Sequence, residues 1–291
     1  MLGSSRMPLS GTAVESRRDQ LRPRRRTAGL TWSAVLALLV GWSLRGAGFN
    51  AGFFSNPLAQ RQTRRFIDGF LHPDLSRSYL AEVARSAIIT VQISFAGLAV
   101  GVIIGVPLSF LAASNLAINR TPGLPRWRRV LGLAPYHLSR NLLNLLRAVP
   151  ELVWALVFIT AVGLGPFAGA LAIGVHSAGL LGKLWAEQME AVDDGPVEAI
   201  RLLGARRTSL GLLAVLPQAR QNLLSLTLYQ WECNVRAAAI VGFVGAGGIG
   251  QDLDVSIRLF LYSQTSVLIG TILVLVVGAD ALSAVVRRTL R

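Results

Sequence analysis

The residues most able to do chemistry in this 291-residue chain are a few charged side chains within or beside long apolar stretches. Glu232 and Arg236 are four residues apart, which places them on one helix face in the favourable acid-to-base order. We expect them to neutralise each other, but if water or a solute enters beside that helix, Arg236 could attract an oxyanion. Glu151, which lies four residues after Arg147, and Arg258 are further candidates for a solute pathway.

Histidine and cysteine give weaker signals. His176 lies in an apolar stretch, where a hydrogen-bonded packing role is the simpler interpretation and a pathway role is the alternative. The single cysteine, Cys233, has no partner for an intrachain disulfide, and no group of Cys and His has metal-ligand spacing. The chain also lacks a recognisable Ser-His-Asp set, carboxylate pair or nucleophile elbow. We predict no catalytic residue, metal site or cofactor site in this chain.

Residues 245–250 formally satisfy a dinucleotide-binding pattern through Gly245, Gly247, Gly248 and Gly250. The match is weak because the segment follows an apolar stretch and has no surrounding strand-helix-strand unit. We expect a flexible break between two helices, with a gate or a contact on the outer side of the membrane as the functional alternative. The only lysine, Lys183, lacks the glycine-rich loop of an ATP site.

A short charged cassette separates two apolar stretches and contains Glu198-Ala199-Ile200, Gly204 and Leu216-Pro217. Small residues on one side of a helical turn let another protein approach closely. We expect Leu216-Pro217 to end that helix, because proline removes a backbone donor. The cassette therefore reads as a docking surface, and an ordinary amphipathic connector is the alternative.

The elements that must position these residues are membrane-spanning helices. Four segments long enough to cross a bilayer contain no Asp, Glu, Lys or Arg: residues 27–44, 86–119, 152–182 and 259–279. Gly163 to Pro166 divides the third segment between two helices, the first of which begins near Asn141, and a further span covers about 222–244. We predict an all-α polytopic bundle with about six crossings.

Three residues in the second span, Gly97, Gly101 and Gly105, recur at four-residue steps and predict a close helix contact. A contact within the subunit is the simpler expectation, and a dimer seam is the alternative. Pro107 and Pro150 predict kinks.

The formal charge of +14 lies mainly beside the spans, as the positive-inside rule expects of cytoplasmic loops, so we exclude nucleic acid as a partner. We predict a flexible basic cytoplasmic tail at 1–26, a first transmembrane helix at 27–45, an outer or interfacial segment at 46–85 and a transmembrane core at 86–288. The docking loop covers about 183–221, and both termini are cytoplasmic. The outer segment is unusually basic, and a piece near 63–71 could lie along the membrane surface.

The cassette spacing resembles the EAA loop of ABC importer permeases, with Ile200 in place of the third alanine and Ala214 at the apolar position. Further blocks are similar to phosphonate permeases of the PhnE type, within the MetI-like superfamily: 149–156 (VPELVWAL), 163–169 (GLGPFAG), 195–199 (GPVEA), 215–218 (VLPQ), 234–238 (NVRAA) and 245–251 (GAGGIGQ). The resemblance covers roughly residues 75–288.

This resemblance implies a bacterial inner-membrane homodimer surrounded by lipid, two cytoplasmic ATPases that hold ATP and Mg²⁺, and an extracytoplasmic phosphonate-binding protein. Transport would proceed by alternating access, with Glu198 and Gly204 transmitting movement and Pro217 ending the lever. Alternatives are a MetI-like permease for phosphite, phosphate or another small solute, an ion-coupled secondary transporter, and a membrane scaffold that transports nothing.

Overall fold

The computed structural model describes residues 23–48, 52, 56–117 and 126–289. The chain divides into two compact units, residues 1–64 and 65–291. In the first unit, α2 (Pro23–Gly46) covers the predicted first crossing, and most of the predicted basic tail lies outside the described residues. The helix α3 (Pro57–Leu71) begins in this unit and includes the piece predicted to lie along the membrane surface.

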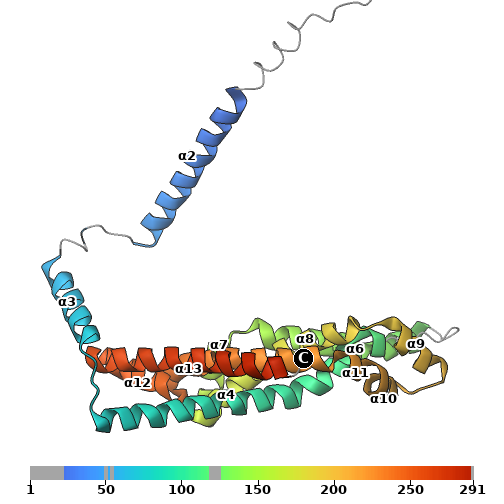
Figure 1. Cartoon of the computed structure of the whole chain (residues 1–291). Coiled ribbons are helices and arrows are strands. Elements are labelled where there is room, and N and C mark those ends of the chain that lie inside the picture. Colours follow the sequence, from blue (N-terminus) through green and yellow to red (C-terminus); the bar gives the residue numbers. More distant parts are fainter. Residues whose placement is uncertain (1–22, 49–51, 53–55, 118–125, 290–291) are drawn as a thin grey trace, which may run out of the picture. The chain divides into compact units, whose positions relative to one another are not determined.

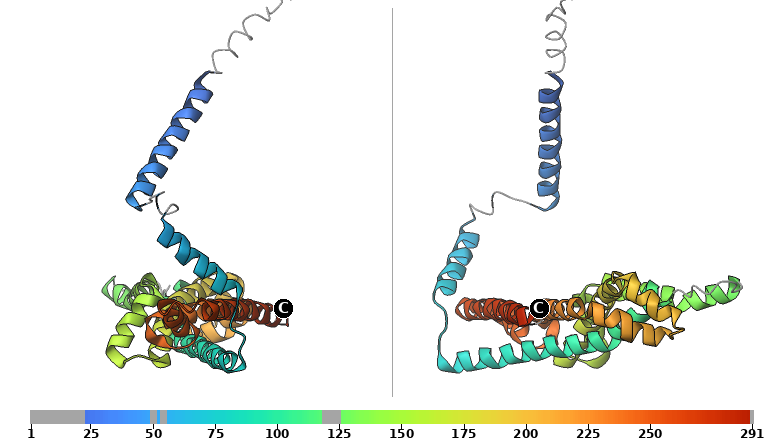
Figure 2. Two further views of the ribbon diagram at one scale, coloured as in Figure 1. Left: turned by 90° about the vertical axis from the view of Figure 1, so that its left-hand side faces the viewer. Right: turned by 45° about the vertical axis from the view of Figure 1, so that its right-hand side comes forward.

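The second unit is a bundle built on α4 (Arg77–Ala112), α8 (Pro166–Glu190), α11 (Leu216–Val241) and α13 (Tyr262–Thr289). Figures 1 and 2 show these long helices running along the bundle. Every regular element among the described residues is helical, as predicted. The helices α4, α8 and α13 are each long and apolar enough to cross a membrane, and two bent pairs raise the number of candidate spans to five within the described residues.

The α4–α8 contact forms the centre of the bundle. A Cβ added to Gly101 would lie 2.9 Å from the Cβ of Ser177, and one added to Gly105 would lie 3.3 Å from the carbonyl oxygen of Ala178. Gly97 likewise faces α8, at Ile173. The predicted glycine face therefore forms a contact within the subunit, where two backbones approach closely because side chains are absent.

The two bent pairs provide the remaining crossings. The helices α6 (Arg126–Ala148) and α7 (Glu151–Val162) meet at a 90° bend just before Glu151, at the predicted Pro150 kink. By contrast, Pro107 lies inside α4, which continues as one helix. Between α7 and α8, Gly163 and Gly165 have φ of +99° and +135°, which confirms the predicted turn between the third and fourth spans.

The second bent pair joins α11 to α12 (Ile249–Arg258) through η3 (Gly242–Ala246), with a bend of 56°. The glycine-rich segment is thus a break between helices, as expected. The sequence did not predict α12 as a separate helix.

Two short helices and one π-helical turn connect α8 to α11: α9 (Asp194–Leu202), α10 (Arg207–Leu210) and η2 (Gly211–Val215). The chain leaves α4 through another short helix, α5 (Ser114–Ala117). A buried apolar cluster fixes this connector to the bundle, and it includes Leu116, Met189, Val197 and Val215. One face of the predicted docking loop is therefore packed, and the other is free.

The prediction that Leu216-Pro217 ends a helix is wrong. Pro217 lies in the first turn of α11, and α10, η2 and α11 follow one another without a gap. Leu216 N–H donates to Gly211 O, five residues back, so the helix has left its regular bonding pattern before the residue that lacks a donor. Proline is tolerated in a first helical turn because an N–H there would have no acceptor within the helix.

Candidate functional site

The predicted docking segment is centred on α9. The Asp193 carboxylate accepts a hydrogen bond from Gly195 N–H at 3.1 Å and so caps the start of the helix. Asp193 N–H in turn donates to the Gln218 side chain of α11 at 3.2 Å. Val197 is fully buried beneath α9, whereas Ala199 is exposed. The small residue is therefore available for close approach by another protein.

The end of α9 is an exposed apolar turn. Leu202 and Leu203 are 80% and 86% exposed, among the most exposed leucines that the structure describes. Gly204 follows with φ of +75° and ends the helix, a position where glycine avoids the steric cost of a side chain. A Cβ added to Gly204 would meet nothing within 4 Å, so the chain itself leaves this surface open.

Glu198 does not point freely into solvent. Its carboxylate accepts a hydrogen bond from Arg201 Nη1 at 2.6 Å, and Arg201 Nη2 donates to the backbone oxygen of Asn115 at 3.0 Å. The pair links α9 to α5. At the other end of the cassette, Leu216 packs on the apolar cluster and Pro217 is exposed.

The predicted pairing of Glu232 with Arg236 is wrong. The Glu232 side chain is 8% exposed and forms its ion pair with Arg287 of α13, which also donates to Ser283 Oγ at 2.7 Å. Helical spacing brings Glu232 and Arg236 to neighbouring positions, but packing turns Glu232 toward α13. Because Glu232 is buried, loss of Arg287 would leave its charge uncompensated.

Arg236 consequently has no acidic partner among the described residues. It is exposed on α11, and its guanidinium donates only to Cys233 Sγ, at 3.7 Å. Tyr229 and Ile240 lie on the same exposed stripe, at helical spacing from Cys233 and Arg236. An unneutralised cation therefore lies on an open face of an apolar helix.

The other candidate pathway residues are neutralised or used in packing. Arg258 is the last residue of α12 and forms an ion pair with Asp254 at 2.8 Å. His176 Nδ1 lies 3.0 Å from Val149 O and its Nε2 lies 3.7 Å from the Glu151 carboxylate. The packing interpretation of His176 is thus favoured, since the ring ties α8 to the α6–α7 bend.

Arg147 and Glu151 lie on opposite sides of that bend, so their four-residue spacing does not place them on one helix face. Arg147 Nε instead donates to Asn144 Oδ1 at 3.3 Å. Among the residues that the structure describes, Arg236, Arg258 and Glu151 make no hydrogen bond or ion pair with one another.

The glycines after α11 serve close packing. A Cβ on Gly250 would lie 1.9 Å from Ala239 O, and Thr90 Oγ1 accepts a hydrogen bond from Ile249 N–H at 3.0 Å. Gly245, Gly247 and Gly248 all have positive φ, and Gly245 O accepts from Gly165 N–H at 3.0 Å. These contacts account for the glycine pattern without a nucleotide. The gate role remains a prediction.

Two polar clusters were missed in the sequence. Ser177 and Gln230 both donate to Asn234 Oδ1, at 2.8 and 3.0 Å, in the interior of the bundle. Near the α9 connector, Arg140 donates to both carboxylate oxygens of Glu190. Polar residues inside an apolar stretch could have signalled the first cluster. The second had no sequence signal, because fifty residues separate its partners.

A family model described as "Binding-protein-dependent transport system inner membrane component" matches residues 105–291. The phosphite transport system permease PtxC of Stutzerimonas stutzeri is 41% identical over 218 residues, which are 74% of this chain and 73% of that protein. The phosphate-import permease PhnE of Mycolicibacterium smegmatis is 37% identical over 201 residues, 69% of this chain and 35% of that protein. These relatives agree with the family resemblance found in the sequence blocks.

The fold has a solved counterpart. A chain of the MetNI methionine ABC transporter, in inward-facing conformations, superposes with a TM-score of 0.62 at 20% identity, over 75% of this chain and 100% of that one. At that level of identity the likeness concerns the fold alone, and it agrees with the predicted MetI-like bundle.

Proposed function

This chain belongs to the family of binding-protein-dependent transport system inner membrane components, and on that premise we propose that it moves a phosphorus oxyanion across the membrane. It is a multi-pass permease subunit of an ABC importer, and so a transport subunit rather than an enzyme. Phosphite, phosphonate and phosphate are the proposed substrates, in line with the names of its relatives. The solute is imported by alternating access.

The observation that supports an anionic solute is the state of Arg236. A guanidinium in a spanning helix must face water or protein, because hydrocarbon cannot solvate it. Its neighbour Glu232 is already paired with Arg287, so no carboxylate among the described residues cancels the positive charge of Arg236. A tetrahedral phosphorus oxyanion presents pairs of acceptor oxygens that the planar fork of a guanidinium binds in bidentate fashion.

A second copy of the chain would complete this pathway. The stripe of Tyr229, Cys233, Arg236 and Ile240 on α11 is largely uncovered in the part of the chain that the structure describes. If two subunits faced each other across this stripe, Arg236 would line a water-filled path instead of meeting lipid. We also propose that both termini lie in the cytoplasm, on the side of the α9 connector.

Energy would come from a separate cytoplasmic ATPase dimer that binds ATP and Mg²⁺, and an extracytoplasmic binding protein would deliver the solute. The exposed turn of Leu202, Leu203 and Gly204 is the proposed contact with the ATPase. Its apolar, open surface lies beside the packed Val197 side, so a push on α9 reaches the bundle. Glu198 supports the turn through Arg201.

The decisive experiment reconstitutes this permease with its ATPase and binding protein in liposomes and measures uptake of labelled phosphite, methylphosphonate and phosphate. We expect uptake of at least one of them to require ATP. Uptake driven by an ion gradient without ATP would instead identify a secondary transporter, and ATP-dependent uptake of an unrelated solute alone would refute the substrate class.

The role of Arg236 is tested in the same liposomes. Arg236→Gln should lower uptake by at least about tenfold, the size of a lost charged contact, and Arg236→Lys should retain part of it. Arg258→Gln is the matched comparison and should have the smaller effect, because Asp254 already neutralises that arginine. Equal uptake in Arg236→Gln and the wild type would refute the pathway assignment.

A further inference from the structure

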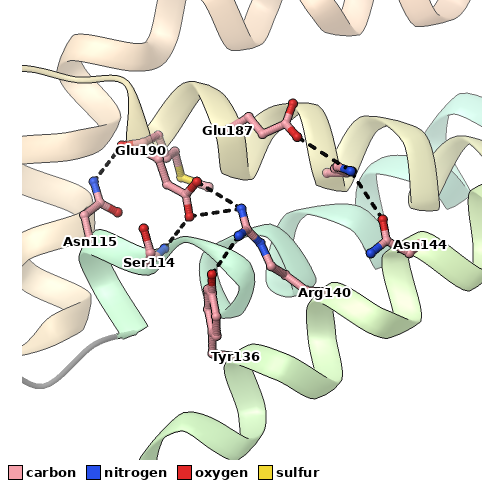
Figure 3. Close-up of polar contacts among 9 residues, drawn as sticks. Ser114, Asn115, Tyr136, Arg140, Asn144, Glu187 and Glu190 are labelled. Carbon is pink, nitrogen blue, oxygen red and sulfur yellow. Dashed lines mark hydrogen bonds and ion pairs between the residues drawn. The ribbon is translucent and has the colours of Figure 1, made fainter.

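The polar contacts around α5 join α9 of the predicted docking segment to α5, α6 and α8. We call Ser114, Asn115, Arg140, Glu190 and Arg201 the α5 junction. Glu190, the last residue of α8, accepts a hydrogen bond from Ser114 N–H at 2.6 Å, and Asn115 Nδ2 donates to Met189 O at 2.7 Å. Figure 3 shows these bonds between the start of α5 and the end of α8. They fix the chain directly after α4 ends.

Glu190 also binds α6. Arg140 Nη2 donates to the two carboxylate oxygens of Glu190 at 3.2 and 3.0 Å, and Arg140 Nη1 donates to Tyr136 Oη at 2.7 Å (Figure 3). The Arg140 guanidinium lies over the Tyr136 ring, 5.1 Å from its centre. A single carboxylate thus connects α5, α6 and α8, with a planar cation held in a fixed orientation.

The junction receives α9 through Arg201, whose guanidinium binds both the Glu198 carboxylate and the Asn115 backbone oxygen. Displacement of α9 therefore pulls on α5 directly. Between α4 and α5, Ala113 has extended backbone angles of φ −79° and ψ 119°, so the two helices are not one rigid rod. Without further support, a pull on Asn115 would bend this break and leave α4 in place.

In addition to the apolar packing of Leu116, α5 is held in place by Glu190 and Arg140. Their side chains are 22% and 34% exposed, so water can compete for them when the helices separate. The α4–α8 contact deeper in the bundle is closely packed backbone against backbone and offers no such exchange. A polar contact of this kind can exist in made and broken states, as a two-state coupling element requires.

We propose that Glu190 is a positioning residue of the transport cycle, which holds α5 to α6 and α8 so that movement of α9 reaches α4. This inference rests on the proposed function, because it assigns a role to contacts behind the ATPase-facing segment. Loss of the Glu190–Arg140 pair lets ATP hydrolysis continue while the bundle follows it less often. The expected defect is one of coupling, not of assembly.

The test uses the complete transporter in liposomes and measures labelled phosphite, methylphosphonate or phosphate taken up per ATP hydrolysed. Glu190→Gln keeps an acceptor for Ser114 N–H but loses the ion pair. We expect it to lower the ratio at least about fivefold, with ATP hydrolysis largely retained. Glu190→Ala should lower the ratio further, because Ser114 N–H then loses its acceptor as well.

Arg140→Gln should match Glu190→Gln, and the double variant should be no worse than either, since both remove one interaction. Glu187→Gln is the matched control: it lies one turn earlier on α8 and pairs with Lys183 at 3.8 Å. Its ratio should equal that of the wild type. Arg140→Lys, which keeps the charge and loses the fork of donors, should give an intermediate ratio.

An unchanged ratio in assembled Glu190→Gln transporter overturns the inference. So does failure of both Glu190→Gln and Arg140→Lys to assemble with the ATPase, because the junction is then needed only for folding. These results differ from failure of the proposed function, in which the wild-type transporter takes up none of the three oxyanions with ATP.

Discussion

The α4–α8 contact and the α9–η2 connector both depend on glycine, but they use it for opposite purposes. Along α4, Gly101 and Gly105 have helical geometry and admit a second backbone within van der Waals distance. After α9, Gly204 has φ of +75° and faces open space. The first use builds a contact with no freedom to rearrange, and the second ends a helix where a partner can dock. The same residue type thus forms a rigid contact where the backbone is helical and an open helix end where φ is positive.

The largest predicted effect concerns the packed contact. In Gly101→Leu, the added side chain must enter a space where even a Cβ lies 2.9 Å from Ser177 Cβ. We expect a loss of at least about 3 kcal/mol and little folded protein, measured by the monodisperse fraction after detergent extraction. Gly270→Leu in α13 is the control, because nothing lies within 4 Å of a Cβ there. Equal yields of the two variants would contradict the packing described for α4 and α8.

A buried ion pair gives the next effect. Glu232→Gln leaves Arg287 without its carboxylate partner in the packed part of α11 and α13. Breaking such a pair costs about 3–5 kcal/mol, so the midpoint of thermal unfolding in detergent should fall clearly. An unaltered midpoint would mean that Arg287 finds water or another acceptor when Glu232 is neutralised.

The open connector should respond less to substitution. Gly204→Ala imposes a side chain on a left-handed backbone angle, at a cost of about 1–2 kcal/mol confined to the end of α9. Gly195→Ala, in the first turn of the same helix, has no such angle and serves as the control. Hydrogen exchange of the α9 amides would detect the difference. The comparison fails if both variants exchange at the same rate.

Gly204→Leu sharpens this result, because the subunit itself has room for the larger side chain. If its uptake falls well below that of Gly204→Ala while the two proteins are equally stable, the extra loss belongs to a partner that contacts this turn. Equal and normal uptake in both would refute the docking role of Gly204.

The smallest effect is expected at an exposed ion pair. Glu187 lies 3.8 Å from Lys183, and their side chains are 46% and 31% exposed. Glu187→Gln should change stability by no more than about 0.5 kcal/mol, since a surface pair of this spacing gains little over its hydration. A thermal shift as large as that of Glu232→Gln would remove the distinction between packed and open regions.

The sequence predicted the glycine face of α4 and favoured a contact within the subunit, but it did not identify α8 as the partner. A four-residue step places positions without side chains in one row, whichever helix packs against them. The sequence also predicted the turn after the third span, since that turn depends on residues close together in the chain. The continuation of the helix through Leu216-Pro217 was missed. Proline normally ends a helix, and the π turn that accommodates it here has no clear local signal.

Pairing was harder to predict than placement. Helical spacing predicted an ion pair between Glu232 and Arg236 and placed Glu151 four residues after Arg147. In the structure both glutamates contact other side chains, Arg287 and His176. For Glu232 the decisive contact comes from α13, 55 residues away. For Glu151 the α6–α7 bend cancels the spacing altogether.

Composition, charge-free segments and short motif blocks by themselves determined that this chain is an all-α membrane permease of the binding-protein-dependent type, because hydrocarbon allows few other solutions for such segments. Tertiary structure alone decided which charges remain unpaired and which helices α9 can pull. Arg236 is open only because Glu232 pairs with Arg287 of α13, and Glu190 reaches Ser114 and Arg140 only because the end of α8 meets the start of α5 beside α6. Such contacts join residues distant in sequence, and helical periodicity describes one helix at a time.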